Sequence, residues 1–333
     1  MLLTARVVCV RNGLLESAHR VHVAVVDARG QTVASAGDPD ISTFFRSAVK
    51  PFQALPLVED GVVDALGLTT GELALCCASH NAEAMHVSGA RALLSKVGLS
   101  EADLECGPHR PMSEAAADAL VRVGESPGRI HNNCSGKHAG MLALAVHHGW
   151  PTAGYVTAEH PVQRRMLAEI VRWSGMAEDE IATGKDGCGV VSFRAPLSRL
   201  AVAFARFAEA AANGEPARRV VSAMTTHPFM IAGSGRLCTA VMEVAGGAVF
   251  AKTGAEGVYG AGDIQGRVGV AIKVEDGARR ASTVALVSVL DALGLLDADE
   301  VTSLRSFAKP VLRNTLGDIV GEIRAEIDLD FKP

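Results

Sequence analysis

Hydrophobic and polar positions divide the chain into β-like ends and a helical middle. Residues 21–27 form a β-branched run, Ala28-Arg29-Gly30 is a turn signal, and residues 31–36 continue in a strand-like pattern. This combination predicts a hairpin. Nearer the C-terminus the pattern predicts strands separated by glycine-rich turns, at 237–245, 248–252 and 267–275. An apolar-periodic helix is then predicted over 279–293.

The middle of the chain carries the helical spacing of apolar residues in five segments. These are 83–97, 114–123, 137–148, 161–174 and 197–212. Strands at both ends with helices between them predict one α/β (α+β) domain over 1–333. Its mainly antiparallel sheet would come from about 1–75 and 230–333, flanked by helices, and its mostly helical region from about 76–229.

Composition narrows the class of protein. Hydrophobic residues make up 48% of the 333, and charged residues 21%, which allows a sizeable core and excludes wholesale disorder. The net charge of -5 gives no electrostatic support for a nucleic-acid partner. No apolar window reaches the roughly 20 residues of a membrane span, and Met1-Leu2-Leu3 does not begin a signal-peptide pattern. The odd number of cysteines, seven, argues against a disulfide framework. A cytoplasmic location is therefore expected.

Three short motifs follow one another in a meaningful order. They are S-x-x-K at Ser47 to Lys50, S-x-N at Ser79 to Asn81, and K-T-G at Lys252 to Gly254. Penicillin-binding proteins and serine β-lactamases use the same trio in the same order. Each motif alone has a plain structural explanation: an N-cap serine with a surface lysine, or a strand that ends in a turn. The ordered trio is more specific than its parts.

The chemistry of these residues favours a nucleophilic serine. Ser47 and Lys50, three apart on a predicted helix, share a face. A serine hydroxyl needs a base to take its proton, and lysine serves when burial and a second cation lower its pKa. Lys252 is the candidate second cation, and Ser79 the candidate proton relay. The Thr253-Gly254 pair would offer donors to a substrate carboxylate or to an oxyanion.

A second group of candidates contains cysteines. Cys134 precedes a predicted helix, where the helix dipole and Lys137 should lower the pKa of its thiol. Cys188 lies in the glycine-rich segment 185–189, so two thiolates with a nearby Lys, Asp or His are candidate zinc ligands. Spacing alone favours two half-buried thiols, because there is no C-x-x-C. A Cys134–His138 nucleophilic pair ranks below Ser47, since it leaves the ordered trio unexplained. The glycine spacing of a phosphate-binding loop is absent.

At these positions the sequence resembles the rhizobial-type (class 3, thermolabile "asparaginase II") L-asparaginases over nearly its whole length. The resemblance rests on Phe45-Arg46-Ser47-Ala48-Val49-Lys50-Pro51-Phe52-Gln53, Ala78-Ser79-His80-Asn81, Asn132-Asn133-Cys134-Ser135-Gly136-Lys137-His138, Asp186-Gly187-Cys188-Gly189 and Lys252-Thr253-Gly254-Ala255-Glu256-Gly257. It implies the fold of serine β-lactamases and glutaminases, and a homodimer.

The same resemblance implies the contents of the site. Two Ser-Lys pairs would form it, Ser47 with Lys50 and Ser79 with Lys252. Zinc would be held nearby by three side chains with two others close to it: Cys134, Lys137 and Cys188, then Asp186 and His138. Lysine must be neutral to bind a metal ion.

The expected activity is hydrolysis of L-asparagine to L-aspartate and ammonia, in asparagine catabolism, through an acyl-enzyme on Ser47. The candidates for binding the substrate are Arg46, Asn81, His138, Thr253, Gly254 and Glu256. A glutaminase is a close rival hypothesis, because one methylene is typically worth only about 1–3 kcal/mol in a pocket. The ordered trio also fits a β-lactamase or D,D-peptidase, and the candidate ligands also fit a zinc- or amino-acid-binding protein without activity.

Overall fold

The computed structural model describes residues 4–214 and 216–332, so Met1-Leu2-Leu3 lies outside it. The chain forms two compact units. The sheet unit contains the chain up to Ala48, Ala195–Glu209 and the chain from Ala240, and the helical unit contains Val49–Arg194 and Ala210–Thr239. The protein is a mixed α/β molecule with an antiparallel sheet and many helices, as predicted.

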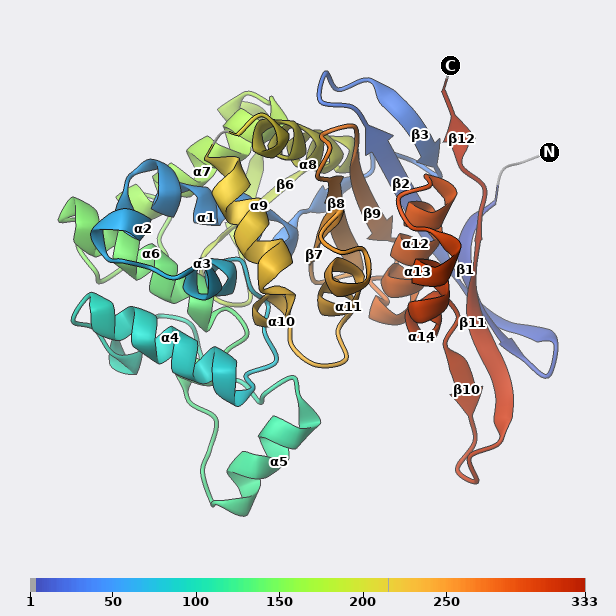
Figure 1. The fold of residues 1–333 in the computed structure, drawn as a ribbon, viewed down its shortest axis with the longest axis horizontal. Coiled ribbons are helices and arrows are strands. Elements are labelled where there is room, and N and C mark those ends of the chain that lie inside the picture. The colour runs from blue at the N-terminus through green and yellow to red at the C-terminus, as the bar shows by residue number, and fades with distance from the viewer. Residues whose placement is uncertain (1–3, 215, 333) are drawn as a thin grey trace. The chain divides into compact units, whose positions relative to one another are not determined.

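Both chain ends build the main sheet. Within the described residues it has nine strands: β1 (Ala5–Arg11), β2 (Leu14–Val26), β3 (Thr32–Ala36), β7 (Val249–Thr253), β8 (Val258–Asp263), β9 (Gly269–Val274), β10 (Val311–Arg313), β11 (Ile319–Ile327) and β12 (Asp330–Phe331). The order is β10-β11-β1-β2-β9-β8-β7, with β3 joined to β2 and β12 to β3. All of these pairs are antiparallel. The first strands therefore lie beside the last ones (Figure 1).

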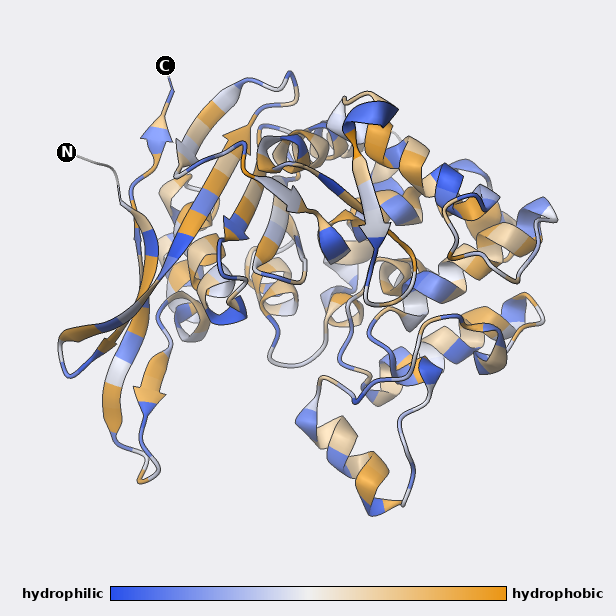
Figure 2. Cartoon of the chain, turned by 180° about the vertical axis from the view of Figure 1, so that it is seen from behind, coloured by the Kyte–Doolittle hydropathy of each residue, from blue (hydrophilic) through white to orange (hydrophobic). Residues whose placement is uncertain are grey.

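Two turns set the register of β1, β2 and β3. Asn12 and Gly13 join β1 to β2 with φ of 48° and 81°, the left-handed pair that a two-residue hairpin turn requires. The predicted hairpin turn at Ala28-Arg29-Gly30 joins β2 to β3. Polar and apolar residues alternate along the strands of this part of the sheet (Figure 2), which places alternate side chains on opposite faces.

Helices cover the centre of the sheet. Nearly every residue of β7, β8 and β9 is buried. A Cβ at Gly260 would lie 2.0 Å from the ring of Phe204 in α8 (Leu197–Ala212), so this glycine permits close contact between helix and sheet. α12 (Arg279–Ala292) packs against β9 and β11. The remaining elements assigned wholly to this unit are β4 (Ser42–Phe44), α13 (Ala298–Ser303) and α14 (Arg305–Ala308).

One predicted strand is wrong. The segment predicted as a strand over 237–245 forms α11 (Leu237–Val244). Most of its residues are buried, so the helical period is hidden in a short apolar run that also fits a strand.

The helices predicted in the helical unit are confirmed to within a few residues. Its helices are α1 (Lys50–Glu59), α2 (Val62–Ala65), α3 (Thr70–Cys76), α4 (Ala84–Lys96), α5 (Glu114–Arg122), α6 (Ser135–His148), α7 (Pro161–Ser174), α9 (Ala217–Thr226) and α10 (Pro228–Ile231). A hairpin of β5 (Ala182–Lys185) and β6 (Val191–Pro196) follows α7. A Cβ at Gly136 in α6 would lie 2.4 Å from the carbonyl oxygen of Leu75 in α3. This close contact brings the start of α6 beside the segment that follows α3.

Candidate active site

The segment with Ser47 and Lys50 folds as two successive turns. Arg46–Val49 is a 3-10 turn, and α1 begins at Lys50. Pro51 thus occupies the first turn of α1, where the missing N–H removes no helical hydrogen bond. The prediction of one helix through both residues is corrected, because Ser47 precedes the α-helix. Ser47 belongs to the sheet unit and Lys50 to the helical unit.

Lys50 buries its amine in the helical unit. The residue is 1% exposed, and its Nζ donates to the carbonyl of Ala78 at 2.5 Å, to Ser79 Oγ at 3.0 Å and to Cys134 Sγ at 3.2 Å. A buried lysine amine is costly unless it is hydrogen-bonded, and these acceptors provide partners for it. The lysine of the S-x-x-K motif therefore contacts the serine of the S-x-N motif.

Two buried thiols lie beside this lysine. Cys134 is the N-cap of α6, and Cys188 lies in the loop between β5 and β6, where it accepts from Lys137 Nζ at 3.1 Å. The contact with Cys188, together with burial, raises the pKa of Cys134. The expected lowering at Cys134 is therefore wrong. The same contact lowers the pKa of Cys188, and Lys137 lowers it further.

Cys134, Lys137 and Cys188 offer the donor types of a zinc site. Two sulfur atoms and one nitrogen match the ligands that zinc prefers, with lysine as the less usual one. Asp186 acts on Lys137 and Cys188 through its charge. Within the described residues, no three or more His, Cys, Asp or Glu side chains are grouped to hold a metal. A metal here would therefore need the lysine as a ligand. Burial opposes the charge on Lys137, but the two thiols raise the pKa of its amine, so a bound ion would have to displace a proton.

One ring nitrogen of the buried His138 has no hydrogen-bond partner among the described residues. The residue is 0% exposed, its Nδ1 lies 2.7 Å from the Tyr155 hydroxyl, and its Nε2 has no hydrogen-bond partner in the described structure. Burial and the neighbouring Lys137 lower the pKa of His138 to about 3, so the ring is neutral. The Cys134–His138 pair that the sequence allowed is not formed, since Nδ1 is bonded to Tyr155 and Nε2 to nothing among the described residues.

The segment after Ser79 is held by a second buried histidine. His80 Nδ1 accepts the backbone N–H of Ala82 at 3.1 Å, which places the ring proton on Nε2. Nε2 lies 2.9 Å from Ser135 Oγ, in the first turn of α6. Ala82 has a φ of 60°, a conformation that non-glycine residues adopt only when their surroundings impose it. His80 therefore ties the Ser79 segment to the helix that follows Cys134.

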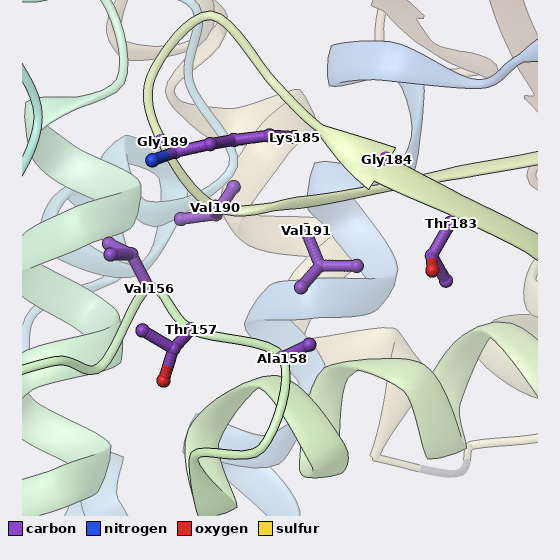
Figure 3. Close-up of a pocket in the computed structure, with 9 residues that line it drawn as sticks. All are labelled: Val156, Thr157, Ala158, Thr183, Gly184, Lys185, Gly189, Val190 and Val191. Carbon is purple, nitrogen blue, oxygen red and sulfur yellow. The ribbon is translucent and has the colours of Figure 1, made fainter.

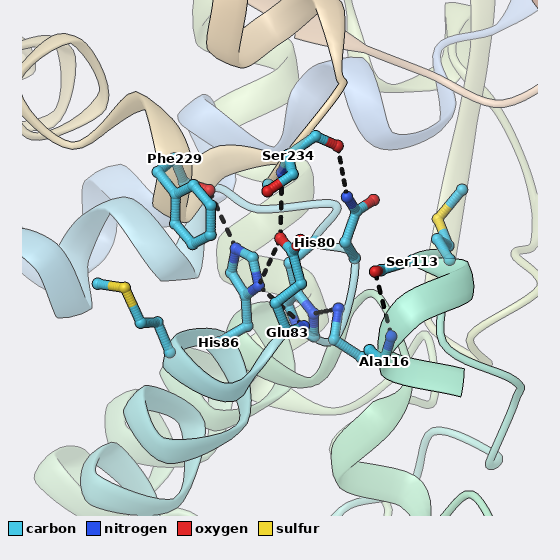
Figure 4. Close-up of polar contacts among 12 residues, drawn as sticks. His80, Glu83, His86, Ser113, Ala116, Phe229 and Ser234 are labelled. Carbon is cyan, nitrogen blue, oxygen red and sulfur yellow. Dashed lines mark hydrogen bonds and ion pairs between the residues drawn. The ribbon is translucent and has the colours of Figure 1, made fainter. Parts of the chain in front are cut away.

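A third histidine stacks beneath it (Figure 4). The His86 ring lies parallel to those of His80 and Phe229, with centroids 5.1 and 5.0 Å away. Its Nδ1 accepts the Glu83 N–H at 3.2 Å and its Nε2 donates to the Phe229 carbonyl at 3.0 Å. Glu83 in turn accepts the N–H of Ser234 at 3.1 Å. This stack links the Ser79 segment to α10.

Asn81 has its amide bonded within the protein. Its Nδ2 donates to the Ser234 carbonyl at 2.9 Å, and its Oδ1 accepts from Arg236 Nη1 at 2.7 Å. Arg236 is 8% exposed. The sequence motifs did not reveal this arginine, because none of them surrounds it and it lies 155 residues from Asn81.

The sheet unit assembles the other predicted residues. Lys252, at 0% exposed, and Thr253 end β7. A Cβ at Gly254 would lie 2.9 Å from the Phe45 carbonyl, so the K-T-G segment passes directly against the backbone that leads into Ser47. Only glycine allows this approach.

Arg46 and Glu256, both in the sheet unit, each act on the charge of Lys273, a lysine that no sequence motif contains. Both have a positive φ, 52° and 58°. Lys273 Nζ donates to the Glu256 carbonyl. Burial lowers the pKa of Lys273, with Glu256 opposing and Arg46 adding to this effect. Asp276 and Glu275 also oppose the effect of burial, so Lys273 and Arg46 lie in a cluster with three carboxylates.

A cavity of about 330 Å³ lies in the helical unit beside the Cys188 loop (Figure 3). Residues from both ends of that loop and from the segment before α7 line it. No motif predicted this cavity.

A family model described as L-asparaginase II matches residues 7–325. The chain belongs to the L-asparaginase II family. This membership confirms the resemblance found in the sequence. None of the helices in the described part of the chain has the length and apolar composition of a membrane span.

The chain is also similar to solved structures, at low sequence identity. The native form of a crystallised protein named Mglu is 17% identical over 84% of this chain and 66% of its own, with a TM-score of 0.44. Mglu in its tris and glutamate form is 16% identical over 84% and 60%, with a TM-score of 0.37. The chain thus spans slightly less than two thirds of the native Mglu chain. No curated protein matches it.

Proposed function

We propose that this protein hydrolyses L-asparagine to L-aspartate and ammonia through a serine acyl-enzyme. The observation that carries the proposal is the buried Lys50 amine, within 3.0 Å of Ser79 Oγ in a chain of the L-asparaginase II family. The amine donates to a carbonyl, a hydroxyl and a thiol of the described chain, and none of these acceptors is a carboxylate. A lysine buried in this way is suited to exchange protons with a serine.

The proposed reaction is acyl transfer. Neutral Lys50 takes the hydroxyl proton of Ser47 as Oγ attacks the side-chain amide carbon of asparagine. The tetrahedral intermediate collapses, the C–N bond breaks, and the nitrogen leaves as ammonia with a proton from the lysine. Water then attacks the aspartyl ester, and Ser47 recovers its proton. Ser79 and Lys252 carry protons between these steps.

Substrate binding is assigned to polar groups of the sequence motifs. Backbone and hydroxyl donors of Thr253 and Gly254 would stabilise the developing oxyanion. Arg46 and Glu256 supply the opposite charges that the zwitterionic head group of asparagine needs. The unpartnered Nε2 of His138 supports a direct hydrogen bond to substrate. The amide of Asn81 is already hydrogen-bonded to Arg236 and Ser234. Asn81 is therefore proposed to contact substrate by its shape and position, without a hydrogen bond from its amide.

We extend the proposal to a zinc ion held by Cys134, Lys137 and Cys188, with Asp186 close by. Two sulfur donors and an amine support this assignment. When bound, the ion would supply positive charge that orients polar groups of the substrate. The serine already provides the nucleophile, so Lys137 and the two thiols serve to hold and orient. The proposal also includes a cytoplasmic location and a homodimer. Light scattering of the purified protein would test the homodimer.

The test is ammonia release from L-asparagine and L-glutamine, measured side by side on purified protein with zinc and with a chelator. Release from asparagine at a higher kcat/KM supports the proposal. A preference for glutamine would replace the substrate, and release from neither would overturn it. The chelator arm separates an essential ion from a dispensable one.

A paired substitution then identifies the nucleophile. Ser47→Ala should abolish release of ammonia and leave no acyl-enzyme detectable by mass spectrometry. Ser79→Ala should slow the reaction and still form the acyl-enzyme. If instead Ser79→Ala removes the acyl-enzyme and Ser47→Ala retains it, the two serines exchange roles.

A further inference from the structure

One face of the β5–β6 hairpin carries both polar and apolar side chains, and none of them has a role in the proposed reaction. Lys185 pairs with Val191, and Thr183 with Phe193. Side chains of directly opposed residues lie on the same face of a hairpin, and positions two apart share that face. Lys185, Thr183 and Val191 therefore stand together.

This face forms one wall of the cavity of about 330 Å³ (Figure 3). The opposite wall is the segment Val156–Ala158, and Val190 lines the cavity between them. Its size lies in the range of small-molecule pockets, which are typically about 300–1,000 Å³ and mostly apolar with a few polar groups. Valine methyls and Ala158 form the apolar lining.

Lys185 supplies the charge of the cavity. It is exposed, and among the described lining residues it is the one charged side chain. Its ammonium makes no ion pair or hydrogen bond within the described part of the chain, whereas the Thr157 hydroxyl is already bonded to the Gly154 carbonyl at 2.9 Å. A cation beside branched apolar side chains is complementary to a molecule with a carboxylate at one end and methyl groups at the other.

We propose that this cavity binds a short branched monocarboxylate. Its carboxylate pairs with Lys185, and its methyl groups contact Val156, Val190 and Val191. This site goes beyond the proposed acyl-transfer reaction, since its occupant is neither substrate nor product.

Occupancy would restrain the loop that carries Cys188. Lys185 and Gly189, at the two ends of this loop, both line the cavity. The loop is short and closed by two backbone hydrogen bonds, Asp186 N–H to the Val190 carbonyl and Gly189 N–H to the Asp186 carbonyl, each 2.9 Å. A ligand that contacts both ends therefore limits the positions open to Cys188, which makes the cavity a regulatory site.

The first test is titration of the protein with 3-methylbutanoate, monitored by ligand-observed NMR, with 3-methylbutan-1-ol as the uncharged analogue. Lys185→Glu should weaken binding by about tenfold or more, the loss of a charge-assisted contact. Arg194→Glu is the matched control, because Arg194 is an exposed cation of the same hairpin on the opposite face. It should change affinity less than about twofold by comparison.

Saturable binding of the carboxylate, lost in Lys185→Glu and kept in Arg194→Glu, supports the site. Absence of saturable binding, equal effects of the two substitutions, or equal binding of the alcohol would overturn it. Hydrogen exchange of residues 185–191 should slow on addition of 3-methylbutanoate, and unchanged exchange would overturn the regulatory part. Both measurements omit asparagine, so their outcome is separate from that of the amidase assay.

Discussion

At the scale of single residues, the buried amine of Lys50 makes three polar contacts. Its Nζ contacts the Ala78 carbonyl, Ser79 Oγ and Cys134 Sγ. Lys50→Met keeps the aliphatic stem and removes the amine. We expect kcat to fall by about 10²–10⁴-fold, the usual contribution of a general base. The measurement is ammonia release under saturating asparagine, with circular dichroism to confirm folding.

Lys96→Met is the matched control for that experiment. Lys96 lies in the same unit, on α4, and its amine pairs with Glu72 at 2.6 Å. Removing it should leave kcat within about twofold, because partly exposed ion pairs contribute about 0–1 kcal/mol to stability and this one lies on another helix. Equal losses of activity in the two variants would remove Lys50 from its proposed role.

Local motifs in the sequence predict some residues of the candidate site and miss others. The ordered motifs contain Lys50 and Ser79. The two cysteines were candidates for a separate reason, one before a predicted helix and one in a glycine-rich segment. The thiol with the lowered pKa was assigned to Cys134 and is Cys188, since the pKa of each depends on contact with the other. Arg236 was missed for the same reason, as its partner Asn81 is remote in sequence.

At the scale of elements, helix α8 and strand β9 are in unusually close contact. A Cβ at Gly269 would lie 2.2 Å from the Ala201 carbonyl and 2.3 Å from the Ala205 nitrogen, both backbone atoms of α8. Gly269→Ala should therefore lower the free energy of unfolding by about 1–3 kcal/mol or more, because the helix must move from the sheet. Urea unfolding, followed by circular dichroism, measures the change.

Gly107→Ala provides the reference, since a Cβ there meets no atom within 4 Å and the residue has no positive φ. Its effect should stay within about 0.5 kcal/mol, as for ordinary surface substitutions. A Gly269→Ala protein as stable as Gly107→Ala would contradict the close packing of α8 on β9.

Elements with a clear period were predicted from sequence with accurate ends. α7 and α8 are amphipathic over several turns, so their apolar stripes mark both helices along their length. α11 was predicted as a strand because burial on most sides erases that stripe. The β1–β2 turn at Asn12-Gly13 carries a recognisable hairpin signal, although no strand was predicted on its N-terminal side.

At the scale of the whole molecule, buried neutral histidines should govern stability in mild acid. Burial lowers the pKa of His22, His80, His86 and His138. The unfolded chain takes up protons on these rings below about pH 6.5, whereas the folded protein does not until its lower pKa values are reached. Stability is thus fully present above about pH 6.5 and falls as pH decreases, by up to about 1.4 kcal/mol per pH unit for each histidine.

His86→Phe tests this directly, because the ring stack with His80 and Phe229 is kept and one titrating group is removed. Unfolding free energies from urea titrations between about pH 5 and 6.5 should give a slope smaller than that of the unmodified protein by up to about 1.4 kcal/mol per pH unit. The interval lies above the carboxylate range, so aspartates and glutamates contribute little. His147→Phe replaces an exposed histidine at the end of α6 and should leave the slope nearly unchanged. If both variants retain the original slope, His86 does not stay neutral in the folded protein at these pH values, and the acid sensitivity arises elsewhere.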